Sequence, residues 1–178
     1  MRRIAPARRA AAVKLVGPQQ WILLPALVVL VVTLILATPI KVFGLTLPEP
    51  VMPLVLAFAW PLIRPSVLAP IALLIVGVVV DLFWGNRLGL WPLGLLAAYA
   101  VVLLSRPFIA GQDTRLLFAW YSGVSALAFF IVYLVTSITA GQPPSLIALF
   151  FQYLPTVLVF PAANWLIERF DDGDLRFR

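Results

Sequence analysis

The residues with the most regular spacing are Gly77, Asp81, Gly85 and Gly89, which follow one another at intervals of four. Asp81 is an ionisable residue inside an apolar stretch. Because a charge is costly to bury in lipid, such a residue is a candidate functional group. Gly77 and Asp81 share one face of a helix, since residues four apart stack on each other. Small residues at this spacing let helices approach closely in a membrane, so the array predicts a helix-packing or partner-binding surface.

Arg87 follows Asp81 across a short predicted turn, in which Gly85 supplies a positive φ angle. Two interpretations stay open for Asp81: it pairs with Arg87 or caps the next helix, or it contacts a partner. Asp81 lies three residues before the end of its apolar stretch. At 1.5 Å per residue this is roughly 4–5 Å inside the membrane boundary, too shallow for a proton relay at the midplane.

The sequence contains no histidine and no cysteine. It therefore has no Ser–His pair, no zinc site built from these residues, no thiolate nucleophile and no imidazole proton shuttle. Small intramembrane enzymes usually need one of these groups. We expect a protein that is not an enzyme and that binds neither a metal nor a cofactor.

The composition indicates an integral membrane protein. Of the 178 residues, 63% are hydrophobic and 11% are charged, against about 45–50% and about 25% in soluble domains. The mean hydropathy is +1.06. A chain of this length cannot hide so much apolar surface from water in a core of its own. We therefore predict an all-α bundle in a bilayer.

Six apolar stretches are candidate membrane-spanning helices. They cover residues 21–40, 51–63, 67–84, 88–104, 116–138 and 145–167. The second stretch has only 13 residues and contains Pro53 and Pro61, whereas a span needs about 17–25 residues. It must therefore begin near Leu45 or tilt into a locally thinned membrane.

The positions of the basic residues favour six spans. With a cytoplasmic amino terminus, six spans place 11 Lys and Arg residues inside and 2 outside, whereas five spans divide them 6 to 7. Cytoplasmic loops carry the excess of Lys and Arg, so six spans with both termini cytoplasmic are predicted. The domains are a basic tail (1–20), a transmembrane domain (21–167) and a short carboxyl-terminal tail (168–178). The first span is expected to be a retained signal anchor.

The amino-terminal tail carries five basic residues: Arg2, Arg3, Arg8, Arg9 and Lys14. Near an anionic leaflet each is worth about 1 kcal/mol of attraction. We interpret this tail as a topology determinant that also contacts membrane lipids. No nucleic-acid binding is expected, because the chain has no basic domain and no aromatic platform outside the bilayer.

Part of the sequence resembles a known bacterial family. The segment Trp60-Pro-Leu-Ile-Arg64-Pro65, the run from Gly77 through Asp81 and Gly85 to Leu88-Gly89, and the later Tyr99 resemble the rod shape-determining protein MreD. The resemblance is strongest over residues 48–99. It departs from the family pattern at the position before Leu88-Gly89, which is often proline and here is Arg87.

The resemblance implies a non-enzymatic, multi-pass scaffold of the bacterial inner membrane that takes part in cell elongation and rod shape. Such proteins bind MreC, and act through it with the peptidoglycan polymerase RodA, its class B transpeptidase and an actin-like filament. Their fold resembles the substrate-binding subunits of energy-coupling-factor transporters. The implied partner-binding or helix-packing residues are Trp60, Arg64, Gly77, Asp81, Gly85, Arg87 and Gly89. We expect the MreC transmembrane helix to dock on the bundle, with residues 77–89 shaping the outer end of the contact.

A vitamin-binding subunit of an energy-coupling-factor transporter is the alternative. Its length, its six spans and its proline-kinked helices would look the same. It would need convergent polar groups at mid-depth. The candidates, Ser125, Thr136, Gln152 and Asn164, are neutral and scattered along the sequence.

Overall fold

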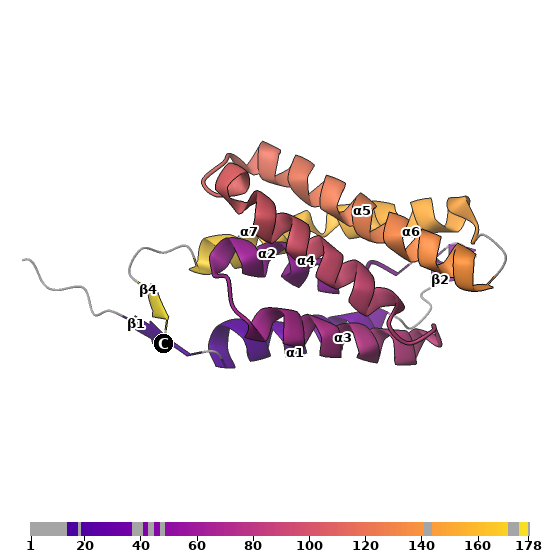
Figure 1. Cartoon of the computed structure of the whole chain (residues 1–178), viewed down its shortest axis with the longest axis horizontal. Helices are drawn as coiled ribbons and strands as arrows, with labels where there is room; N and C mark the ends of the chain where they lie inside the picture. The colour runs from indigo at the N-terminus through magenta and orange to yellow at the C-terminus, as the bar shows by residue number, and fades with distance from the viewer. Residues whose placement is uncertain are drawn as a thin grey trace, which may run out of the picture.

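A computed structural model of the protein describes residues 14–17, 19–36, 41–42, 45–46, 49–140, 144–170 and 175–177. Its helices run side by side along the long axis of the molecule (Figure 1). They are η1 (Gln19–Leu23, a π-helix), α1 (Leu24–Leu36), α2 (Pro53–Ile63), α3 (Leu68–Trp84), α4 (Leu90–Ile109), α5 (Thr114–Ala140), α6 (Leu146–Leu158) and α7 (Phe160–Phe170). The strands are β1 (Lys14–Val16), β2 (Lys41–Val42), β3 (Leu45–Thr46) and β4 (Leu175–Phe177).

The helical class predicted from composition is confirmed. η1 continues into α1, and α6 continues into α7, so that Gln19–Leu36 and Leu146–Phe170 are each one apolar helical segment. The described chain then has a helical segment that overlaps each of the six predicted stretches, although α4, α5 and α7 end beyond the predicted limits. Four segments are long and apolar enough to cross a membrane, whereas α2 and α3 are shorter. The short strands were not predicted.

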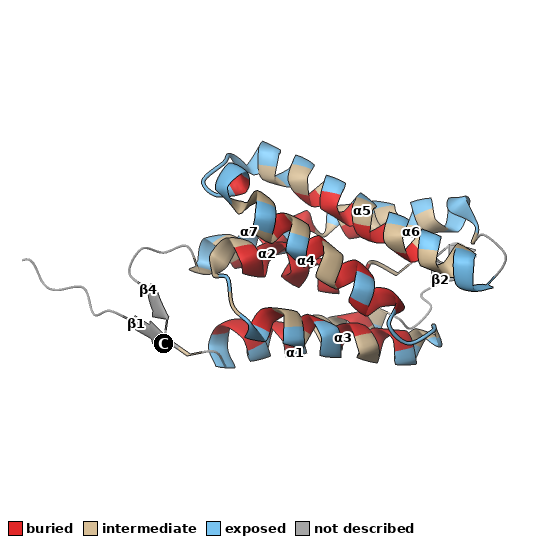
Figure 2. Cartoon of the chain, viewed as in Figure 1, coloured by how far each residue is buried: buried red, intermediate tan, exposed pale blue. Residues whose placement is uncertain are grey.

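Helix α2 lies at the centre of the bundle. It contacts α1, α3, α4 and α7, and every residue from Pro53 to Pro61 is buried. Figure 2 shows this buried layer along α2 and the facing side of α4. A helix that is apolar on all sides must be covered by other helices or by lipid, and here neighbouring helices cover α2. The 11 residues of α2 would rise only about 16 Å.

The two ends of the described chain lie together. β1 pairs in parallel with β4, with Lys14 opposite Leu175 and Val16 opposite Phe177. Both strands are found beyond the same end of the bundle (Figure 1). β2 and β3 form an antiparallel pair before α2. An even number of passes along the bundle brings the two chain ends to one side.

The outer surface of the described helices is rich in large apolar side chains. Examples are Leu27 on α1, Ile75 on α3 and Phe150 on α6, each more than half exposed. Water would penalise so large an apolar surface, whereas lipid does not. The surface and the long apolar helices together are those of a membrane protein.

Candidate functional site

Asp81 is a buried carboxylate that caps the start of α4. Its side chain is 0% exposed. Its Oδ2 accepts a hydrogen bond from the backbone amide of Gly89 at 2.8 Å, and its Oδ1 accepts one from the amide of Trp91 at 3.1 Å. The first amides of a helix lack partners within the helix, and the helix dipole favours a negative charge there. Asp81 thus joins the end of α3 to the beginning of α4.

The turn between α3 and α4 is closed by the main chain as well. Gly85 has φ of 66°, a left-handed conformation that glycine adopts without strain. The amide of Asn86 donates to the carbonyl of Asp81 at 2.8 Å, and the amide of Gly85 donates to the carbonyl of Leu82 at 3.4 Å. This pair of bonds is a Schellman motif, which satisfies the last carbonyls of α3. The predicted positive φ of Gly85 is confirmed.

Gly77 brings the backbones of α3 and α4 into direct contact. A Cβ atom at Gly77 would lie 2.7 Å from the backbone nitrogen of Pro92 and 2.8 Å from its Cα. Both distances are too short for any side chain unless the backbone moves. Gly94 allows a looser approach of α4 to α5, since its Cβ would lie 3.2 Å from the Cγ2 methyl of Val132 and 3.4 Å from the carbonyl oxygen of Ala128. We call residues 68–109, joined in these ways, the α3–α4 hairpin.

Arg87 does not serve as the counter-ion that the sequence suggested for Asp81. Its guanidinium donates to the carbonyl of Thr139 at 2.6 Å, near the end of α5. A positive charge at a helix C-terminus is favourable because the last carbonyls carry partial negative charge. Of the two structural roles that the sequence left open for Asp81, the described residues show helix capping.

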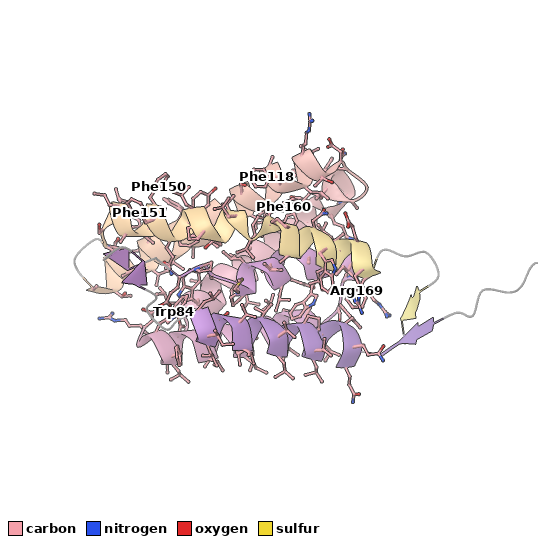
Figure 3. All side chains as sticks on the ribbon, turned by 180° about the vertical axis from the view of Figure 1, so that it is seen from behind. Trp84, Phe118, Phe150, Phe151, Phe160 and Arg169 are labelled. Atoms are coloured by element: carbon pink, nitrogen blue, oxygen red, sulfur yellow. The ribbon has the colours of Figure 1, made fainter. Side chains whose placement is uncertain are left out.

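Aromatic rings fill the space beneath this turn. Trp84 at the end of α3 meets Trp91 edge to face at 5.6 Å between ring centroids, and Trp91 meets Phe129 of α5 at the same distance. Figure 3 labels Trp84 at this end of the bundle. Edge-to-face pairs add to the stabilisation that comes from burial. The pairing of Trp84 with Trp91 across the two helices was not predicted from the sequence.

Trp60 and Arg64 lie away from the hairpin turn. Trp60 is fully buried in α2, and its indole nitrogen donates to the carbonyl of Trp21 in η1 at 3.0 Å. The amide of Arg64 donates to the carbonyl of Trp60 at 2.9 Å, which ends α2. The hydroxyl of Tyr99 donates to the carbonyl of Ser66 at 3.2 Å. These residues hold the α2–α3 connection, one full length of α3 from Asp81.

Thr156 is a buried polar residue that sequence reasoning did not single out. Its hydroxyl accepts from the amide of Val51 at 3.0 Å and donates to the carbonyl of Gln152 at 2.8 Å. The Thr156 carbonyl accepts from the hydroxyl of Tyr121 at 3.1 Å. Thr156 thus links α6 to α5 and to Val51, two residues before α2. The one sequence feature that could have drawn attention to Thr156 is its position next to Pro155, because a proline within a helix leaves backbone groups in need of other partners.

The five basic tail residues add no described contacts. Arg2, Arg3, Arg8 and Arg9 lie outside the described residues, and Lys14 is placed only as a backbone position in β1. The described residues also hold no group of three His, Cys, Asp or Glu side chains that could bind a metal ion.

No protein-family model, no curated protein and no solved structure matches this chain. The geometry of the α3–α4 hairpin and the pattern of its residues are therefore the basis of the functional proposal.

Proposed function

We propose that this protein is an MreD-like scaffold of the bacterial inner membrane that takes part in cell elongation. It is not an enzyme, and it acts by binding the transmembrane helix of a single-span partner, MreC. Through MreC it acts with RodA, its class B transpeptidase and the actin-like filament. The observation that carries the proposal is that the five motif residues between Gly77 and Gly89 lie together in the α3–α4 hairpin, and four of them shape the contact between α3 and α4.

Each motif residue from Gly77 to Gly89 has a distinct physical role in the hairpin. Gly77 permits the backbone contact, Asp81 caps α4, and Gly85 reverses the chain. Gly89 has φ of 96°, and its backbone amide donates a hydrogen bond to the Asp81 carboxylate. Because each role depends on one residue type at one position, these residues would have to recur at the same spacing in related proteins. The departure from the MreD pattern, Arg87, fastens the turn to α5.

We further propose that all six helical segments cross the membrane with both termini in the cytoplasm. Two features support this arrangement: the excess of Lys and Arg in the predicted inner segments and the pairing of β1 with β4. The 17 residues of α3 would rise about 25 Å, close to the hydrocarbon thickness of about 30 Å. The shorter α2 is enclosed by other helices and meets lipid over little of its surface.

The partner helix is proposed to pack on the outward face of α3. Gly77 and Asp81 are buried, so they position this face rather than contact the partner. Ile71, Ile75 and Leu82 are exposed on α3 at spacings that place them in one row. The hairpin fixes this row rigidly against α4, and a rigid surface loses little conformational freedom when a helix binds to it.

Disulfide crosslinking tests this proposal cleanly because the chain has no cysteine of its own. Ile75→Cys and Leu82→Cys would each be combined with single cysteines along the MreC transmembrane helix and oxidised in membranes. Phe130→Cys is the matched control, since Phe130 on α5 and Ile75 are both 55% exposed. We expect crosslinks at the two α3 positions, repeating along MreC with helical periodicity, and none at position 130. Crosslinks at position 130 alone would place the interface on α5 instead of α3. If the two proteins do not associate at all, the proposed function is wrong.

The vitamin-binding alternative gains no support from the site. Among its candidate polar groups, the Asn164 amide donates to Glu168 at 2.6 Å, on the same helix, and Ser125 is buried within α5. Binding of a vitamin by the purified protein, measured as thermal stabilisation, would favour this alternative over the scaffold.

A further inference from the structure

A groove separates α1 from α7 on the side of the bundle away from the α3–α4 turn. Its volume is about 840 Å³. Leu24 and Val28 of α1 form one wall, Ala162 and Trp165 of α7 form the other, and Leu56 of α2 lies at its base. Figure 3 looks onto this side, with α7 above α1. The middle of the groove is lined by apolar side chains.

Polar side chains gather at one end of the groove. Gln20, Glu168 and Arg169 line it there, near the strands that join the two chain ends (Figure 3). The guanidinium carbon of Arg169 lies 5.3 Å from the centroid of the Trp165 ring. Glu168 and Arg169 thus place one negative and one positive charge at this end of the groove. Arg and Trp at such a position are typical of the headgroup level of a bilayer.

The shape and lining of the groove bear on what can occupy it. The groove is open along one side and has a volume of about 840 Å³. Small-molecule sites measure about 300–1,000 Å³. An apolar groove with charges at one end fits an amphipathic molecule. The tail of such a molecule would lie in the bilayer, and its headgroup would lie at the bilayer surface.

We propose that this groove binds one zwitterionic phospholipid with a primary ammonium headgroup, phosphatidylethanolamine. Arg169 binds the phosphate and Glu168 accepts hydrogen bonds from the ammonium, while one acyl chain lies between α1 and α7. Charge-assisted hydrogen bonds of this kind are about twice as strong as neutral ones. An anionic lipid such as phosphatidylglycerol would satisfy Arg169 but would offer Glu168 no cation. The net charge of +6 would by itself favour anionic lipids, so a preference for the zwitterionic one is diagnostic.

Native mass spectrometry of the purified full chain measures this preference. The protein would be mixed with phosphatidylethanolamine, phosphatidylcholine or phosphatidylglycerol of identical acyl chains. We expect one phosphatidylethanolamine to stay bound, with affinity about tenfold above phosphatidylcholine, whose quaternary ammonium cannot donate to Glu168. Equal retention of all three lipids would overturn the proposal.

Variants separate the headgroup contacts from the groove itself. Glu168→Gln should remove the preference for phosphatidylethanolamine over phosphatidylcholine, and Arg169→Gln should weaken both. Arg115→Gln is the charge-matched control, because Arg115 is exposed at the start of α5 and does not line the groove. If Arg115→Gln weakens binding as much as Arg169→Gln does, general electrostatics explain the binding and the proposal is wrong.

Filling the groove provides a second, independent test. Ala162→Phe places a ring between α7 and α1 and should reduce lipid retention at least about tenfold, as loss of an acyl-chain site predicts. Ala119→Phe is the control, since Ala119 lines a separate shallow groove between α4 and α5. Unchanged lipid binding by a folded Ala162→Phe protein would overturn the assignment. So would a disulfide crosslink in membranes from Val28→Cys to a partner helix or to a second copy of the chain.

Discussion

The α3–α4 hairpin and the α6–α7 segment are both pairs of consecutive helices, but they are joined differently. α3 and α4 meet through Gly77 and Pro92 with backbone atoms almost in contact, and the Asp81 carboxylate binds the amides of α4. α6 and α7 form one helical segment that breaks at Val159. The α3–α4 junction is therefore held by backbone packing and hydrogen bonds, whereas the α6–α7 junction is a kink in one helix.

Prolines account for the kink. Pro161 has no amide hydrogen to donate to the carbonyl of Val157. Pro155, nearly two turns earlier, removes another donor, so the hydrogen bonds of the helix are interrupted near Val159. Thr156 is the one buried residue of α6. The bend turns α7 towards α2, which leaves the groove between α7 and α1. The hairpin is thus held by close backbone packing, and the kinked segment forms one wall of the groove.

The largest expected effect is at Gly77. Gly77→Ala drives a methyl group into the backbone of Pro92, and overpacking of this kind costs about 3 kcal/mol. The measurement is thermal unfolding of the purified protein in detergent. Gly123→Ala is the control, because a Cβ at Gly123 meets nothing within 4 Å. If both variants unfold at the same temperature as the wild type, the close approach of α3 and α4 is not present in the protein.

Substitution of Asp81 should have the second largest effect on stability. Asp81→Ala leaves the amides of Gly89 and Trp91 without their acceptor, the second of them in a buried position, at a cost of about 2 kcal/mol. Asp81→Asn keeps one acceptor oxygen and should lose less. Both are measured by thermal unfolding together with crosslinking of Leu82→Cys to MreC. Crosslinking should fall in parallel with stability, because Asp81 acts by positioning α3. Loss of crosslinking in Asp81→Asn at unchanged stability would mean that Asp81 contacts the partner directly.

The regions with strong local signals could be predicted from the sequence. Apolar stretches of sufficient length located the helical segments, because burial in lipid depends on composition more than on tertiary detail. The glycine spacing around Asp81 located the close packing and the turn. The resemblance grouped Trp60 and Arg64 with these residues, yet the two lie at the other end of α3.

Contacts between segments distant in sequence could not be predicted. The bond between Thr156 and Val51 joins residues 105 positions apart, and no periodicity encodes such a pair. The same holds for Arg87, which sits six residues from Asp81 but binds Thr139 of α5. The groove depends on the bend at Val159 and on the separation of α1 from α7, which are both tertiary properties.

The smallest effect is expected at Thr156, within the kinked segment. Thr156→Val keeps the shape of the side chain but removes the acceptor of the Val51 amide, and should destabilise the protein by about 1 kcal/mol. Thr156→Ser keeps the hydroxyl and should restore most of that loss. Thermal unfolding and lipid retention are measured on the same samples. Because Thr156 anchors α6 next to the kink that sets the position of α7, lipid retention should fall in the valine variant and recover in the serine variant. A valine variant as stable as the wild type, with lipid retention unchanged, would show that the bend is fixed by the prolines alone.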